Sequence, residues 1–122
     1  NARAEIIGER VTTRLNELQK RFPKSIGDVR GLGAMIGVEF VVDGDHYEPA
    51  TQLTNEILAA CVSRRLLLIG AGVYGNVIRF LAPLVITDEQ LDRGLSILCE
   101  EIVAAIENTQ QKQTIPTKAN AI

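Results

Sequence analysis

Apolar residues recur at helical spacing in three stretches of the chain. In residues 5–22 they lie three and four positions apart, and Pro23 ends the run. Residues 48–65 form a second stretch, in which Pro49 suits the first turn of a helix. A third begins at Thr87. The pattern therefore predicts three amphipathic helices, whose apolar stripes are Ile7, Val11, Leu15, Leu18 and Phe22; Leu53, Ile57, Ala60 and Cys61; and Leu91, Leu95, Leu98, Ile102 and Ile106.

The start of the third helix is well marked in the sequence. Thr87 is a good N-cap, and Gln90, three residues later, can complete a capping box. Asp88 and Glu89 place negative charge at the positive end of the helix dipole. We therefore expect the helix to begin at this point.

A period of two predicts the strands. Ala34, Ile36, Val38, Phe40 and Val42 fall on one face, with Glu39 on the other, which indicates a strand of about nine residues ended by the turn-forming "DGD". The run "LLLIGAG" (66–72) predicts a short buried strand, and residues 77–82, stopped by Pro83, predict another. The short separation of these two strands favours a hairpin.

The expected order is helix, strand, helix, strand, strand, helix. It predicts an α+β fold: a small sheet of three or four mainly antiparallel strands with helices packed on one face. We expect one domain over residues 1–108. Residues 109–122 are polar and lack a period, which predicts a flexible tail.

Composition narrows the function classes. The chain has 122 residues, and its 13 basic and 15 acidic side chains give a net charge of −2, which does not favour nucleic-acid binding. No apolar run reaches the roughly 18–20 residues needed to cross a membrane. Cys61 and Cys99 lie in apolar helical patterns, so we expect buried free thiols and a cytoplasmic protein.

Two motifs do not support the chemistry they suggest at first. The glycines of "GLGAMIG" (31–37) are spaced unlike a dinucleotide fingerprint and lead into a strand. His46 is the only histidine, and Asp43, Asp45 and Glu48 near it lack the pattern of a calcium loop. We therefore expect no metal site.

None of the lysines has the setting of a catalytic amine. Lys20 and Lys24 flank the end of the first helix, while Lys112 and Lys118 lie in the expected tail. A lysine that forms a Schiff base needs a desolvated or electropositive setting that lowers its pKa. We expect no catalytic residue in this chain.

Arg79 is the most informative polar residue. It stands in the apolar run "YGNVIRFLAPLVIT" (74–87), where period two places it with Val77 and Leu81 on one face. An unpaired guanidinium is costly to bury. Arg79 could pair with a carboxylate of the protein such as Glu39, could reach water from an edge strand, or could clamp a ligand carboxylate or phosphate in a bidentate way.

Two segments together resemble a known family. "GDVRGLGAMIGVEF" (27–40) and "GNVIRFLAPLVITDEQLDRGLSIL" (75–98) are similar to the C-terminal small domain of class III, pyridoxal-phosphate-dependent aminotransferases. The similarity covers residues 3–106. Within the family it favours the 4-aminobutyrate branch over the acetylornithine and ornithine branches.

The resemblance implies a function for Arg79 and for the whole parent enzyme. The family arginine that matches Arg79 binds the substrate carboxylate, and the parent would transfer an amino group from 4-aminobutyrate to 2-oxoglutarate. Pyridoxal phosphate, the catalytic lysine and the phosphate-binding loop belong to a preceding large domain in this family, whose members are cytosolic homodimers. This chain would then be an inactive fragment with no cofactor-binding residue. Another ω-aminotransferase, or a free-standing anion-binding regulatory domain, remains an alternative.

Overall fold

The chain forms three helices and five strands over its described part. A computed structural model describes residues 1–114. The elements are α1 (Ala2–Arg21), β1 (Ile26–Leu32), β2 (Met35–Val42), β3 (Asp45–Pro49), α2 (Thr51–Ser63), β4 (Ile69–Ala71), β5 (Val77–Leu81) and α3 (Asp88–Thr114).

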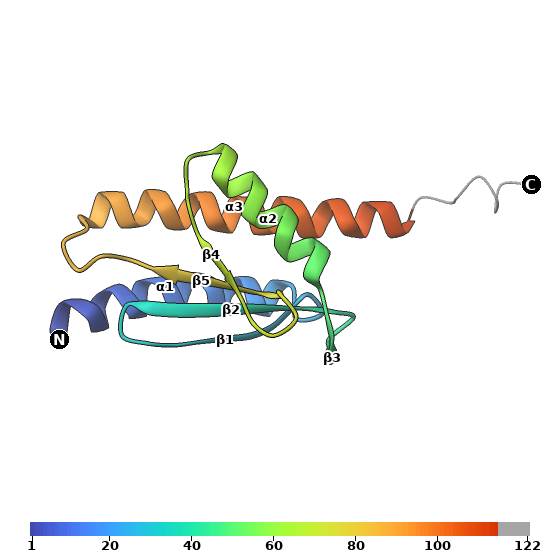
Figure 1. Ribbon diagram of the computed structural model, residues 1–122, viewed down its shortest axis with the longest axis horizontal. Coiled ribbons are helices and arrows are strands. Elements are labelled where there is room, and N and C mark those ends of the chain that lie inside the picture. The colour runs from blue at the N-terminus through green and yellow to red at the C-terminus, as the bar shows by residue number, and fades with distance from the viewer. Residues whose placement is uncertain (115–122) are drawn as a thin grey trace, which may run out of the picture.

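The strands form one antiparallel sheet. Its order is β1-β2-β5-β4, and β3 pairs with β2 beyond this path (Figure 1). β5 therefore lies inside the sheet, between β2 and β4. β4 and β5 form the predicted hairpin. The expectation of a buried strand over 66–72 was wrong, because β4 covers only Ile69–Ala71 at the edge of the sheet and is largely exposed.

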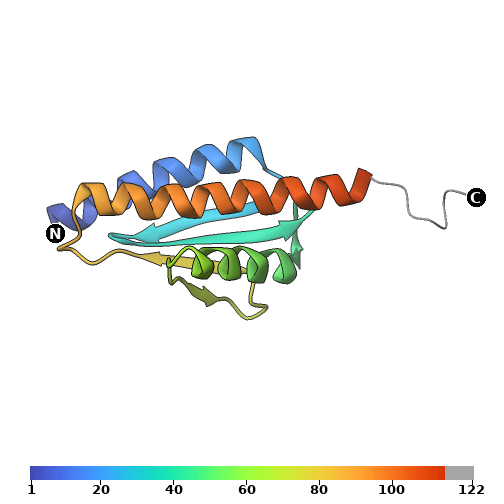
Figure 2. The same cartoon turned by 90° about the horizontal axis from the view of Figure 1, so that it is seen from above.

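All three helices lie on one face of the sheet. Figure 2 looks onto them, with α3 between α1 and α2 and the strands behind. Alternate residues of β2 and β5, among them Val38, Phe40 and Ile78, point into the core that the helices close. The other face, which we call the open face, is covered by no described helix. The predicted α+β class with helices on one face is confirmed.

The sheet has more strands than the three or four expected. β1 was missed because glycines interrupt it and its residues show no apolar alternation. β3 was missed because four of its five residues are exposed. It also takes in Pro49, so α2 begins after Ala50 and Pro49 does not lie in its first turn, as we had expected. Asp43 and Gly44 both have positive φ (51° and 75°), which suits the tight turn between β2 and β3.

The third helix begins as predicted and ends later. The Thr87 hydroxyl accepts from the Gln90 backbone N–H at 3.1 Å, and the Gln90 side chain accepts from the Thr87 N–H at 3.1 Å, which completes the capping box. α3 continues past Asn108, where its apolar period weakens, to Thr114. The rest of the expected tail, residues 115–122, lies outside the described residues.

The two cysteines are buried free thiols, as predicted. Burial, with a smaller contribution from the Glu101 carboxylate, raises the pKa of Cys61 to about 11. Burial also raises the pKa of Cys99. Both thiols therefore stay protonated at neutral pH and act as small apolar core residues.

Close backbone packing joins α1 to the turn between β1 and β2. A Cβ built on Gly8 of α1 would overlap the carbonyl oxygen of Gly33, and Gly33 itself has a φ of +58°. Because Gly8 has no side chain, the backbone of α1 can contact the β1–β2 turn directly. Gly94 of α3 differs, because its Cβ would lie 3.7 Å from Leu66 and 3.9 Å from Phe80, at ordinary contact distance.

Replacing Gly8 or Gly94 by alanine should change the free energy of unfolding in opposite directions. Gly8→Ala should lower the free energy of unfolding by about 1–3 kcal/mol, because the added methyl forces α1 away from the turn. Gly94→Ala should raise it by about 0.5–1 kcal/mol, because alanine favours the helix and its methyl fits. Urea denaturation followed by circular dichroism measures both. Equal effects would show that α1 does not depend on this close approach.

Candidate functional site

Arg79 lies at the middle of β5 on the open face of the sheet. Its neighbours Ile78 and Phe80 point the other way into the core, as period two predicts. The side chain is exposed and makes no hydrogen bond or ion pair with any residue that the structure describes. β5 is an inner strand, so the water that Arg79 reaches is that of the open face and not of a sheet edge.

A row of cross-strand neighbours passes through Arg79. Gly37 of β2 lies opposite it on one side and Ile69 of β4 on the other. Beyond Gly37, Arg30 of β1 completes the row. Arg30 has a carboxylate partner, since its guanidinium lies 3.3 Å from Asp28 on the same strand. Two guanidinium groups therefore stand on one face with Gly37 between them, and one of them is already paired.

Glu39 does not partner Arg79. It lies opposite Val77 in β5 and opposite Asp28 in β1, one row away from the arginine. No ion pair joins Glu39 to Arg79, so the internal pair that the sequence left open is not formed among residues 1–114.

Large apolar side chains lie on two sides of Arg79 on the open face. The next row joins Leu32, Met35 and Leu81, which are 85%, 45% and 60% exposed. Ile69, directly beside Arg79, is 56% exposed. Exposed apolar side chains gathered beside a charged residue are typical of a surface that another protein segment covers.

Asn76 fixes the start of β5. It is 6% exposed, and its side-chain amide donates to the Phe40 carbonyl at 3.0 Å. In return the Phe40 N–H donates to the Asn76 carbonyl at 2.8 Å. This exchange fixes the register of β5 against β2, and with it the position of Arg79 opposite Gly37.

The loop before Asn76 is tied to α2. Thr51, the first residue of α2, donates its hydroxyl to the Tyr74 carbonyl at 2.6 Å. Gly72 and Gly75 both have positive φ, which the turn requires. The loop backbone is thus held, while the Val73 and Tyr74 side chains stand 94% and 67% exposed.

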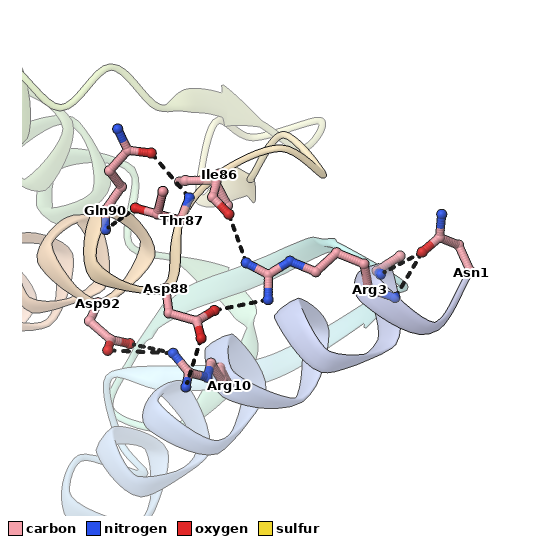
Figure 3. Close-up of polar contacts among 9 residues, drawn as sticks. Asn1, Arg3, Arg10, Ile86, Thr87, Asp88, Gln90 and Asp92 are labelled. Carbon is pink, nitrogen blue, oxygen red and sulfur yellow. Dashed lines mark hydrogen bonds and ion pairs between the residues drawn. The ribbon is translucent and has the colours of Figure 1, made fainter.

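An ion-pair network holds the segment that follows β5. The Arg3 guanidinium donates to the Ile86 carbonyl at 2.7 Å and to Asp88 at 2.9 Å (Figure 3). Arg10, two turns further along α1, lies 3.6 Å from Asp88 and 3.2 Å from Asp92. The connection from β5 to α3 is therefore anchored to α1 at Ile86 and Asp88.

The other polar residues considered from the sequence gather no site around Arg79. Lys20, Lys24 and Lys112 are exposed, and Lys118 lies outside the described residues. His46 is exposed on β3. A cleft of about 510 Å³ lies between α2, the end of α3 and β2, but Arg79 is not among the residues that line it. In the described part of the chain, no helix has the length and apolar character needed to span a membrane.

The fold and the sequence both match one enzyme family. Residues 1–103 match the model of the class-III aminotransferases, and the chain belongs to this family. It is 45% identical over 98 residues to a 5-aminovalerate aminotransferase of Pseudomonas aeruginosa and 43% identical over 98 residues to a 4-aminobutyrate aminotransferase of Escherichia coli. Each alignment covers 80% of this chain but only 23% of the relative, so the chain spans about a quarter of these proteins.

A solved structure shares the fold of this chain. The chain is similar to a phospholyase from Arthrobacter in complex with phosphoethanolamine, with a TM-score of 0.75 and 27% identity over 84% of this chain and 24% of that one. The family uses pyridoxal phosphate. The described lysines, Lys20, Lys24 and Lys112, are exposed.

The network around Asp88 should make stability depend on pH. The hydrogen bond from Arg3, followed by the charge of Arg10, holds the pKa of Asp88 below its ordinary value. A lowered folded pKa stabilises the fold fully above the unfolded pKa of about 4, and this stabilisation is lost as the pH falls through the folded pKa.

We therefore expect Asp88→Asn to be less stable than the unmodified chain at pH 7, and the difference to shrink below about pH 4. Urea denaturation at a series of pH values measures it. The same comparison in an Arg3→Gln background should show a smaller difference, because the first cause of the pKa shift is gone. A difference that is constant from pH 7 to pH 2 would contradict this account.

Proposed function

We propose that this chain is the C-terminal small domain of a pyridoxal-phosphate-dependent aminotransferase, in which Arg79 binds the substrate carboxylate. The parent enzyme transfers the amino group of 4-aminobutyrate to 2-oxoglutarate. The observation that carries the proposal is an exposed guanidinium without a protein partner among the described residues, at the centre of an inner strand whose start is fixed by Asn76.

The chemistry of the two substrates suits one arginine. A guanidinium presents two parallel N–H donors that match both oxygens of a carboxylate. Both 4-aminobutyrate and 2-oxoglutarate carry a carboxylate, so the same clamp can orient either one with its reacting end directed away from Arg79. A fixed strand is suited to this task, because a flexible arginine would not set the distance to the reacting atom.

The remainder of the enzyme lies outside this chain. Pyridoxal phosphate and its lysine would belong to a large domain, consistent with the chain's 23% share of its relatives. The apolar residues of the open face, such as Leu81 and Ile69, would be covered by that domain or by a second subunit of a homodimer. Two buried free thiols favour the reducing cytoplasm.

The names of the relatives also favour a second amino donor, 5-aminovalerate. Proteins named 5-aminovalerate aminotransferase are as similar to this chain as those named for 4-aminobutyrate. 5-Aminovalerate is one methylene longer and keeps the terminal carboxylate, so Arg79 would bind it in the same way. Discrimination by one methylene is worth only about 1–3 kcal/mol, which makes both donors plausible substrates of one site.

Replacing Arg79 in the full-length enzyme tests the clamp. Arg79→Lys keeps the charge but removes the bidentate fork, and we expect KM for 2-oxoglutarate to rise by the equivalent of about 2–4 kcal/mol. Arg93→Lys on α3 is the matched control, because Arg93 lies away from the open face and already has Glu89 as a partner at 3.6 Å, and it should leave KM unchanged. Steady-state kinetics with 4-aminobutyrate as donor measures both. An unchanged KM in Arg79→Lys would leave this arginine with a purely structural role.

The chain alone should not hold the cofactor. After incubation with pyridoxal phosphate and reduction with borohydride, mass spectrometry should find no single preferred lysine carrying a pyridoxyl group, because the described lysines are exposed. Full modification of one particular lysine would show that the chain has a cofactor site of its own.

A further inference from the structure

Gly37 is the residue directly opposite Arg79 on β2. We infer that it determines specificity in the carboxylate site: its missing side chain leaves room for the chain of the substrate to lie against the sheet beside Arg79. The inference rests on the proposed function and names a second residue of the same site. Glycine inside a strand weakens the strand, and it often marks a place where a ligand or another backbone comes close.

The fold itself does not require glycine at this position. The backbone of Gly37 is not in the left-handed region, and a Cβ built on it would lie 3.6 Å from Val77 and 3.8 Å from the Arg30 carbonyl, both ordinary contact distances. Two nearby glycines differ from it. A Cβ on Gly31 would overlap the Met35 carbonyl oxygen, and Gly33 has positive φ. Local packing explains these two glycines and leaves Gly37 unexplained.

Of the two cross-strand positions beside Arg79, the one at Gly37 has no side chain. Side chains directly opposite each other on adjacent antiparallel strands stand about 4.5–5.5 Å apart at Cβ. On the β4 side this place is taken by Ile69, while on the β2 side Gly37 leaves it empty. A ligand that reaches the Arg79 guanidinium along the sheet therefore has space over Gly37.

The far side of this space is also defined. Arg30 lies beyond Gly37 in the same row, but Asp28 already pairs with its guanidinium at 3.3 Å. Arg79 is thus the free cation next to the gap, as judged over residues 1–114. Only the side chain of Gly37 is missing from this row, and the space that this leaves suits the narrow chain of an unbranched aliphatic acid such as an ω-amino acid or 2-oxoglutarate.

Filling the gap in the full-length enzyme tests the inference. Gly37→Val should raise KM for 2-oxoglutarate at least tenfold, and Gly37→Ala should have a smaller effect in the same direction. Valine favours strands, so this chain carrying Gly37→Val should unfold at a urea concentration no lower than the unmodified chain. Tyr47→Val, at a 96% exposed strand position on β3, is the matched control and should leave KM unchanged.

An unchanged KM in Gly37→Val would overturn the inference. A raised KM combined with a lowered melting temperature of the full-length enzyme would also overturn it, since that result would place another polypeptide segment over Gly37. Failure of the proposed function gives a different result: the unmodified enzyme would not use 4-aminobutyrate. The Gly37 variants would then be compared with 5-aminovalerate as donor and 2-oxoglutarate as acceptor.

Discussion

The pairing of β2 with β5 is the interaction on which the rest of this structure depends. Side chains alternate between the faces of a strand, so a slip of one residue would turn Arg79 into the core and Phe80 into water. The buried Asn76 opposes such a slip, because its amide and its carbonyl both bond to Phe40. The Ala50 N–H donates to the same Phe40 carbonyl, so the start of α2 is tied to this point as well. The register of β5 against β2 and the position of α2 are thus fixed at the same residue, Phe40.

The one-sided arrangement of the helices follows from close packing and leaves a face for function. α1 settles onto the β1–β2 turn because neither Gly8 nor Gly33 has a side chain there. Arg3 and Arg10 then connect α1 to the start of α3 through Asp88, which keeps the segment after β5 in place. The apolar core lies wholly between helices and sheet, and the charged and apolar residues of the open face contribute little to it. Ligand binding can therefore decide which residue types stand at positions 79 and 37, because the core does not depend on Arg79 or Gly37.

Local patterns in the sequence were sufficient for much of this fold. The capping box of Thr87 and Gln90, the apolar stripe of α3 and the face of Arg79 depend on residues within a few turns or one strand, and each was predicted correctly. The other two stripes were right except at Phe22, which follows the end of α1, and Ala60, which is half-buried. β1 and β3 escaped prediction because they are edge strands without apolar alternation, stabilised by pairing with β2 and not by their own sequence. The choice between Glu39 and a ligand as the partner of Arg79 depends on cross-strand register, which no local pattern contains. The same holds for Gly37, whose importance appears only when its neighbour is known.

Glycines in this chain fall into two kinds, and the difference separates folding from function. Gly8, Gly31 and Gly33 are explained by overlap or by a positive φ, so selection for stability alone would keep them. Gly37 has an ordinary strand conformation and free space, so stability alone would favour a β-branched residue in its place. An exposed arginine without a described partner presents a similar case, because an isolated fold gains nothing from it. The two residues lie opposite each other, and a ligand that needs both a positive charge and a bare strand beside it accounts for the pair.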